Sequence, residues 1–174
     1  MTDKVTAQLD IQNIASNGNT DVWSDFRQIE RLTLEMTQTY TYSLGKYSRF
    51  FIELENNRFM ATRCADCGKV YAPPRPLCPD CMKISEWVEL SGEGTLQTYS
   101  VLHFAPNTNA DVRALQTPYV LGYVLLDGAS TLFPHLVKIA PEDAKIGMRV
   151  KVVYTQHPVQ HPIHLMAFEP LENA

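Results

Sequence analysis

The sequence has no long apolar run and no excess of positive charge. None of its apolar stretches approaches the roughly 20 residues that a helix needs to cross a membrane, which argues against a membrane protein. The formal net charge is −4 at pH 7, whereas a dedicated nucleic-acid-binding protein normally carries a clear basic excess. The chain begins at Met1 with no signal peptide, so we expect a cytoplasmic location.

The sequence also offers little for catalysis. It has no phosphate-cradling loop of the P-loop type, and no spacing indicates paired carboxylates or a Ser-His-Asp arrangement. A nucleophilic cysteine needs a free thiolate and a nearby base, but all four cysteines lie in one stretch whose spacing favours a metal site. His157, His161 and His164 could share a metal ion, although the two prolines between them favour an extended loop. We therefore expect no catalysis by this chain alone.

The four cysteines organise the sequence. Cys64 and Cys67 form one C-x-x-C pair, and Cys78 and Cys81 form another after ten intervening residues. Each pair can place two thiolates on one tight turn, and two facing turns make a tetrahedral cage of four sulfurs, which suits a structural Zn²⁺. Gly68 follows the first pair, where such a turn needs a permissive backbone. Iron in the same cage would give a rubredoxin-type centre. Four buried thiols or two disulfides are the other readings, and disulfides fit a cytoplasmic protein poorly.

Basic residues gather around the cysteine stretch: Arg58, Arg63, Lys69, Arg75 and Lys83. Asp66 and Asp80 oppose them within it. Both a phosphate-facing patch and an ordinary solvated surface fit this distribution.

Three segments precede the cysteines. Residues 1–20 are polar and without a period, which indicates a flexible tail or a partner-binding arm. From Glu30 to Tyr42, large apolar residues alternate with threonines and other polar residues, which predicts an extended strand. This strand has little of its own to pair with, so we expect it to lie across a partner. Residues 46–57 place aromatic residues at helical spacing and end in Asn56-Asn57, which predicts a short amphipathic helix.

The chain after Gly94 has the pattern of a β-barrel. Five strands are predicted, at residues 95–104, 119–127, 130–139, 148–156 and 164–170. Asp127-Gly128 supplies a hairpin turn, and residues 140–149 look like a helical turn between the third and fourth strands. Five strands with such an insert describe an OB-type barrel, and the long loop at residues 105–116 lies on the side where OB barrels bind ligands.

The order of these motifs resembles a bacterial and archaeal family that joins a rubredoxin-like zinc ribbon to an OB-fold. The motifs are a helix, CxxCG, PPR, CPxC and EWVELSGEGT, and a further match is PEDAKIGMRVKVV. The resemblance implies a mainly β fold with an N-terminal arm and short helix, a rubredoxin-like zinc ribbon and a C-terminal five-stranded OB-fold barrel. We place the arm and docking segment at residues 1–45, the helix and ribbon at 46–91, and the OB-fold at 92–174.

Members of this family serve as small subunits of thiolase-like enzymes, such as benzoylsuccinyl-CoA thiolase and the archaeal acetoacetyl-CoA thiolase/hydroxymethylglutaryl-CoA synthase complexes. The resemblance implies a non-catalytic, zinc-binding accessory subunit in a hetero-oligomer with a thiolase-fold partner. It would complete or shield the tunnel that holds a CoA thioester. Candidate contacts to CoA or another ligand are Arg63, Lys69, Arg75, Tyr99, His103 and Phe104.

The alternative is a single-strand nucleic-acid-binding protein. In that case bases would stack on aromatic side chains of the barrel: Tyr99, Phe104, Tyr119 and Tyr123. The acidic charge balance and the family resemblance both favour the accessory subunit over this alternative.

Overall fold

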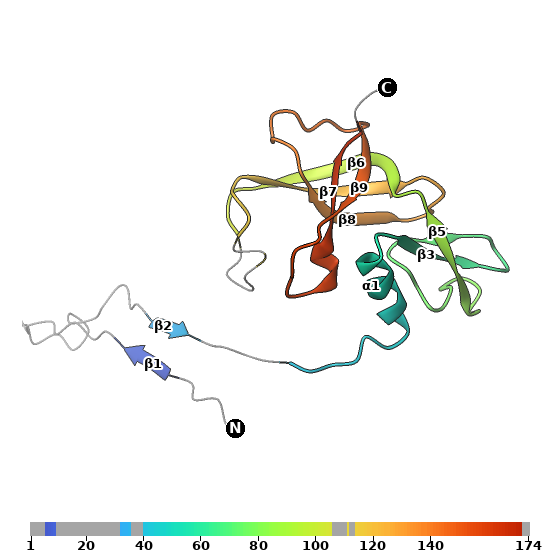
Figure 1. The fold of residues 1–174 in the computed structure, drawn as a ribbon, viewed down its shortest axis with the longest axis horizontal. Helices are drawn as coiled ribbons and strands as arrows, with labels where there is room; N and C mark the ends of the chain where they lie inside the picture. Colours follow the sequence, from blue (N-terminus) through green and yellow to red (C-terminus); the bar gives the residue numbers. More distant parts are fainter. Residues whose placement is uncertain (1–5, 10–31, 36–39, 106–110, 112–113, 172–174) are drawn as a thin grey trace, which may run out of the picture. The chain divides into compact units, whose positions relative to one another are not determined.

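The computed structural model describes residues 6–9, 32–35, 40–105, 111 and 114–171, and the chain divides into two units, Met1–Ser43 and Leu44–Ala174 (Figure 1). The first unit contains a two-stranded antiparallel sheet of β1 (Thr6–Leu9) and β2 (Leu32–Glu35). The second contains a helix, a three-stranded sheet and a closed five-stranded barrel.

The pairing of β1 with β2 corrects two expectations. The strand within residues 30–42 was expected to have no partner in its own chain, but Leu32 lies opposite Leu9 and Glu35 opposite Thr6. The tail at residues 1–20 contains that partner strand, and the rest of the tail lies outside the described residues. The predicted strand is also too long: residues 36–39 lie outside the described residues, and residues 40–42 are not in a strand.

The predicted helix is confirmed. A 3-10 turn, η1 (Gly45–Tyr47), leads into α1 (Ser48–Glu55), whose inner face buries Phe50 and Leu54. The helix ends because Asn57 adopts a positive φ of 57°. The Asn57 and Arg58 amides then donate to the carbonyls of Leu54 and Glu53, which is the Schellman pattern of helix termination. No helix in the described part of the chain combines the length and apolarity needed to cross a membrane.

The cysteine stretch belongs to a sheet of order β4-β3-β5. The central strand β3 (Phe59–Cys64) pairs on one side with β4 (Val70–Tyr71) and on the other with β5 (Ser85–Leu90). All residues of β3 except Arg63 are buried. We call this sheet, with the connection from Tyr71 to Ser85, the ribbon.

All five predicted barrel strands are confirmed. They are β6 (Glu93–Leu102), β7 (Tyr119–Leu126), β8 (Leu132–Val137), β9 (Arg149–Tyr154) and β10 (Met166–Pro170), closed in the order β10-β8-β7-β6-β9. The helical turn expected at residues 140–149 is a hydrogen-bonded turn without a helix, closed by the Asp143 amide on the Ala140 carbonyl. The loop before β10, expected to be extended, contains the 3-10 helix η2 (Pro162–Leu165).

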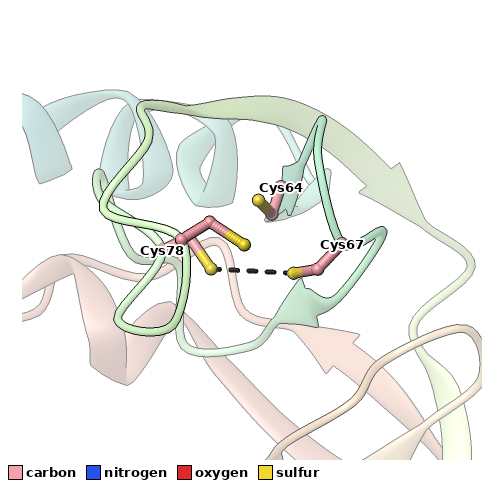
Figure 2. Close-up of side chains that lie close together, drawn as sticks. Cys64, Cys67 and Cys78 are labelled. Carbon is pink, nitrogen blue, oxygen red and sulfur yellow. Dashed lines mark hydrogen bonds between the residues drawn. The ribbon is translucent and has the colours of Figure 1, made fainter.

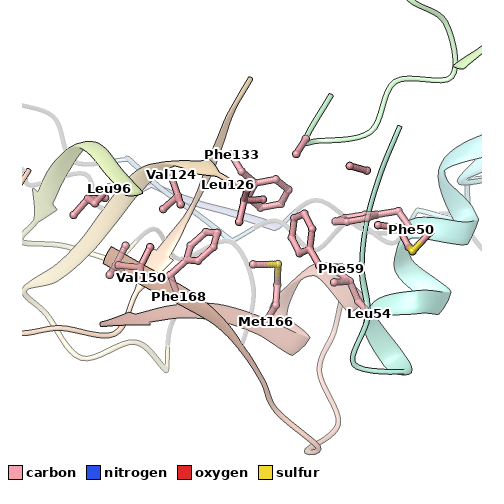
Figure 3. Packing of buried hydrophobic residues seen from close by; sticks show 14 of the residues in the cluster. Phe50, Leu54, Phe59, Leu96, Val124, Leu126, Phe133, Val150, Met166 and Phe168 are labelled. Atoms are coloured by element: carbon pink, nitrogen blue, oxygen red, sulfur yellow. The ribbon is translucent and has the colours of Figure 1, made fainter. Parts of the chain in front are cut away.

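One hydrophobic core joins the helix, the ribbon and the barrel (Figure 3). Phe59 of β3 lies between Phe50 of α1 and Phe133 of β8, with ring centroids 5.7 Å and 5.1 Å away. Phe133 in turn packs edge-on against Phe168 of β10 at 6.1 Å. Aromatic rings in such edge contacts add to the stability gained from burial, so the ribbon is packed onto the barrel as part of the same core.

Hydrogen bonds from the turn after β7 clamp the ribbon to the barrel. The Ser130 amide donates to the Val70 carbonyl, and the Val70 amide donates to the Ser130 hydroxyl. The Thr131 hydroxyl donates to the Ala72 carbonyl at 2.8 Å and accepts from the Ala72 amide at 2.9 Å. Strand β4, which leads from one cysteine pair towards the other, is therefore fixed relative to β7 and β8.

Candidate functional site

The four cysteines come together at one end of the ribbon (Figure 2). Their sulfur atoms lie within 4.8 Å of one another, and those of Cys67 and Cys78 are 3.7 Å apart. A tetrahedral centre with metal–sulfur bonds of about 2.3 Å separates its sulfurs by about 3.8 Å, so the residues present fit a four-coordinate Zn²⁺. Cys64 and Cys78 are buried, whereas Cys67 is exposed. The four sulfurs would complete the coordination of such an ion and leave no position for substrate. We call this cluster the cage.

Two turns of the same geometry present the four sulfurs. In the first, the Cys64 amide donates to the Lys69 carbonyl and the Gly68 amide donates to the Cys64 carbonyl. In the second, Cys78, Lys83 and Met82 make the matching bonds. The residue after the second cysteine of each pair has a positive φ, 72° at Gly68 and 54° at Met82. Glycine adopts this conformation at no cost, whereas methionine is strained there.

Tyr71 is a cage residue that sequence reasoning missed. Its side chain is buried, and its hydroxyl lies 3.3 Å from the Cys78 sulfur. The hydrogen bond that this hydroxyl donates lowers the pKa of the Cys78 thiol to about 6 and raises the pKa of the tyrosine. A hydrogen bond with Cys67, together with burial, raises the pKa of the Cys81 thiol to about 12. The metal-free cage therefore favours a thiolate at Cys78 and a protonated Cys81, so binding a metal through all four sulfurs must release protons.

The predicted ligand residues on the ribbon have different surroundings. Lys69 forms an ion pair with Asp80 at 2.5 Å and so links the two cysteine turns. The Arg75 guanidinium lies over the Tyr71 ring, 5.7 Å from its centroid. Arg63 is exposed on β3. Of the other basic residues nearby, Arg58 is paired with Glu53 and Glu89. Lys69 and Arg75 thus have partners within the ribbon, whereas Arg63 is exposed; contacts of these residues with CoA stay a prediction.

The predicted ligand residues on the barrel do not form one surface. Tyr99 packs against the core, and its hydroxyl donates to the Ala144 carbonyl at 3.0 Å. His103 and Phe104 are exposed just after β6 ends. In the strand register, Tyr99 lies opposite Gly122 and Thr98 opposite Tyr123, which places Tyr99 and Tyr123 on opposite faces of the sheet. These tyrosines therefore cannot form one stacking platform for nucleic-acid bases.

A pocket of about 400 Å³ opens on the barrel, and none of the six candidate contacts to CoA lines it. Its lining comes from β7, β8, β9 and β10, from Asp111, Ala114 and Leu115 before β7, and from residues between 155 and 165 after β9. Part of the loop that we expected beside a ligand thus lies at a pocket. We call it the barrel pocket. Tyr119, one of the four proposed stacking residues, is in its lining.

Two histidines of the pocket lining are close to each other and to η2. The His135 side chain is hydrogen-bonded to the Ile163 carbonyl at 3.0 Å, and burial lowers its pKa. His164 follows Ile163 in η2. Among the described residues, the cage is the one group of three or more potential metal ligands with its ligand atoms close enough to share an ion, and His157, His161 and His164 do not form such a group.

Comparison with known proteins finds one family domain at the ribbon and another at the barrel. The ChsH2 rubredoxin-like zinc ribbon domain matches residues 53–83, and the ChsH2 C-terminal OB-fold domain matches residues 87–155. A DUF35 domain-containing scaffold protein of Methanocaldococcus jannaschii is 38% identical over 97 residues, which are 55% of this chain and 66% of that protein.

Two further similarities concern enzymes. A probable enoyl-CoA hydratase alpha subunit of Thermomonospora curvata is 36% identical over 111 residues, 62% of this chain, but the match spans only 33% of that subunit. The solved Ltp2-ChsH2(DUF35) aldolase contains a chain with a TM-score of 0.58 and 27% identity, and the match covers 75% of this chain and 98% of that one.

Proposed function

The chain belongs to the ChsH2/DUF35 family, whose members join a rubredoxin-like zinc ribbon to an OB-fold, and from this we propose that it is the non-catalytic scaffold subunit of a thiolase-type complex that acts on acyl-CoA thioesters. The observation that carries the proposal is the match to nearly the whole of a chain in an aldolase named for two components, Ltp2 and ChsH2(DUF35). The enoyl-CoA hydratase relative supports acyl-CoA thioesters as the substrate class.

The surface of the ribbon supports a protein partner. Leu77, Met82 and Ile84 stand around the second cysteine turn with 41%, 70% and 68% of their surface exposed, and Leu77 and Ile84 are joined by an isolated β-bridge. Large apolar side chains that are clustered and exposed mark interaction sites on many proteins. We call these three residues the ribbon patch and assign it to the interface with the thiolase-fold subunit. Because the cage and the clamp at Ser130 and Thr131 hold the ribbon, the patch would be presented in one fixed orientation.

The N-terminal unit is proposed as a second docking element. The strand within residues 30–42 was expected to lie across a partner because it would be unpaired in its own chain, but β1 supplies a partner for β2, so that argument no longer holds. What remains is the exposure of Tyr40 and Tyr42, at 72% and 66%. Tyrosine is enriched in protein interfaces, which keeps this segment a candidate contact.

The proposed metal is zinc with a structural role, and the proposed tunnel function belongs to the complex. The barrel would complete or shield the path of the CoA thioester, with Arg63 available to the CoA phosphates. Purified protein should contain about one equivalent of zinc, because four thiolates close the coordination of one ion. Iron, or less than about half an equivalent of zinc, would argue against this assignment.

Co-expression tests the proposal. We expect a thiolase-fold protein to be encoded beside this chain, and the affinity-tagged chain should co-purify with it. The chain alone should show no thiolysis, condensation or hydrolysis of acyl-CoA. Met82→Asp places a charge in the ribbon patch and should reduce co-purification strongly. Leu132→Asp is the control, since Leu132 is exposed on the barrel and lies outside the patch. The scaffold proposal would be overturned if the unmodified chain did not co-purify with the thiolase-fold protein, or if the chain alone turned over acyl-CoA. A chain of residues 45–174 that still co-purifies fully would remove only the docking role of the N-terminal unit.

A further inference from the structure

The outer face of the barrel carries an apolar row where outward residues of a barrel in water are usually polar. Side chains alternate along each strand, and the core takes Val120, Val137 and Phe168. Their neighbours Leu121, Leu136 and Ala167 therefore point outward. The register pairs Leu121 with Leu136, pairs Ala167 with Val153, and sets Phe168 beside Val137, so Ala167 lies next to Leu136. An unbroken row of four apolar side chains thus crosses β7, β8, β10 and β9: Leu121, Leu136, Ala167 and Val153.

This row lines the barrel pocket. All four of its residues are in the lining, together with Asp111, Ala114 and Leu115 before β7 and residues between 155 and 165 after β9. The backbone amide of Gln160 donates to the Asp111 carboxylate at 2.7 Å, which ties Asp111 to the segment after β9. Ala167, although it points outward, is only 4% exposed. The row is therefore the lining of a built cavity and not a bare surface, and the cavity lies within the roughly 300–1,000 Å³ of small-molecule sites.

Several polar side chains of the pocket lining have partners in the protein; the lining holds Asp111, Tyr119, His135, Lys138, Thr155, His157 and His164. Thr155 and His157 are hydrogen-bonded to each other. His135 is bonded to the Ile163 carbonyl, and burial lowers its pKa, so it is neutral at pH 7. The Asp111 carboxylate is engaged by the Gln160 amide. The positive charge in the lining belongs to Lys138, which is half exposed and paired loosely with Glu169 at 3.4 Å. A ligand that fits would lay an apolar body along the row and place a polar end near Lys138.

We propose that the barrel pocket binds an acyl group, meaning an apolar chain or ring that ends in a carbonyl or carboxylate, with that end at Lys138. Two sources share this chemistry, a free carboxylic acid and a thioester. The assignment to the acyl part of a CoA thioester rests on the proposed function, whereas the pocket itself rests on the strand register and the lining. The scaffold would then bind the acyl group of the substrate in addition to positioning its partner.

The test uses the full-length, zinc-loaded chain and cis-parinaric acid, a fluorescent fatty acid. Its fluorescence should rise saturably on binding. Octanoyl-CoA and octanoic acid should both displace it, which establishes the acyl group as the shared determinant, and their relative potency distinguishes a thioester from a free acid. Coenzyme A without an acyl group should not displace it. Absence of saturable binding, or displacement by coenzyme A equal to that by octanoyl-CoA, would overturn the proposal.

Matched variants locate the site. Leu136→Trp fills the pocket and should weaken cis-parinaric acid binding at least tenfold. Leu132→Trp places the same side chain on the same strand and the same face, four residues away and outside the lining, and should change affinity less than twofold. Leu121→Asn, which makes the lining polar without filling it, is the second variant should the first fold poorly, and is expected to weaken binding several-fold. If both pocket variants bind normally, the pocket assignment is wrong.

Failure of this proposal is distinguishable from failure of the scaffold function. A chain that co-purifies with its thiolase-fold subunit but binds no acyl probe would retain the proposed function and lose the acyl site. Loss of co-purification by Leu136→Trp, in a chain that never bound the probe, would identify the occupant as a part of the partner protein and would also overturn the acyl site.

Discussion

Replacing Tyr71 with phenylalanine removes one oxygen atom from the cage surroundings and little else. The ring remains to fill its buried site and to support the Arg75 guanidinium that lies 5.7 Å from its centroid. The hydroxyl that lies 3.3 Å from the Cys78 sulfur is lost, so this substitution isolates one hydrogen bond to a metal ligand.

The expected size of the effect follows from what remains around Cys78. A hydrogen bond to a charged group contributes about 1.5–3 kcal/mol, and removing a partner that orients a metal ligand typically costs about 10–100-fold in affinity. The Cys78 sulfur also has the backbone amides of Cys81 and Asp80 as hydrogen-bond partners. Because these two amides persist, we expect the lower end of the range, a loss of about tenfold in zinc affinity.

The measurement is competition for zinc with a chromophoric chelator at fixed pH, combined with the charge-transfer band of the cobalt-substituted protein, which reports on thiolate donation. Tyr99→Phe is the matched control, since it also removes a hydroxyl that is hydrogen-bonded, here to the Ala144 carbonyl at 3.0 Å in the barrel. The control should cost about 1 kcal/mol of folding stability and leave zinc affinity unchanged. An unchanged affinity and an unchanged cobalt spectrum in Tyr71→Phe, or equal losses in both variants, would show that the Tyr71 hydroxyl does not act on the cage.

Two further predictions concern the barrel. Gly122→Ala should lower the free energy of unfolding by about 1–3 kcal/mol in thermal or denaturant unfolding, because the added Cβ would lie 2.6 Å from both Leu96 Cδ1 and Val137 Cγ2; a variant as stable as the parent would contradict the close packing at this position. Burial lowers the pKa of His135 below 6.5, so the unfolded chain gains a proton that the folded chain resists, and the melting temperature should fall as the pH is lowered from 7 to 5. His135→Gln should flatten this dependence in part, since His161 also has a lowered pKa, and an identical slope would show that His135 is not its source.

Local patterns explain what could be predicted from the sequence. The two cysteine pairs fix the cage because each pair folds its own turn, and the barrel strands follow from alternation over short stretches. The matching geometry of the two turns was also visible, as a lysine two residues after the second cysteine in both CADCGK and CPDCMK. The second turn has Met82 where the first has Gly68, so its positive φ is not evident from the residue type.

Contacts between distant segments explain what could not. Strands β1 and β2 pair with each other although they are far apart in the sequence, and neither strand's sequence indicates its partner. The barrel pocket depends on the register of four strands, which no single stretch encodes. One signal was present: YVLGYVLL is apolar at nearly every position, as is typical of a strand covered on both faces. Taken with the outward Val153 of β9, it pointed to a covered outer face.

The arrangement of ribbon and barrel gives a physical reason why the proposed scaffold would keep a structural metal site. The ribbon patch surrounds the second cysteine turn, so its shape depends on the cage. The lining of the barrel pocket comes from strands and loops of the barrel and contains no residue of the ribbon. Phe59 in the shared core and the hydrogen bonds of Ser130 and Thr131 hold the ribbon in place on the barrel. None of these three residues belongs to the ribbon patch or to the pocket lining. A metal held by four thiolates would stabilise a sheet that is too small to build a large hydrophobic core. Cys64 and Val70 are close in the sequence, so the cage would also hold the part of the ribbon that the clamp binds. A metal bound in the cage would therefore act by fixing the direction in which the ribbon patch faces relative to the barrel pocket, which is the property that the proposed scaffold function requires.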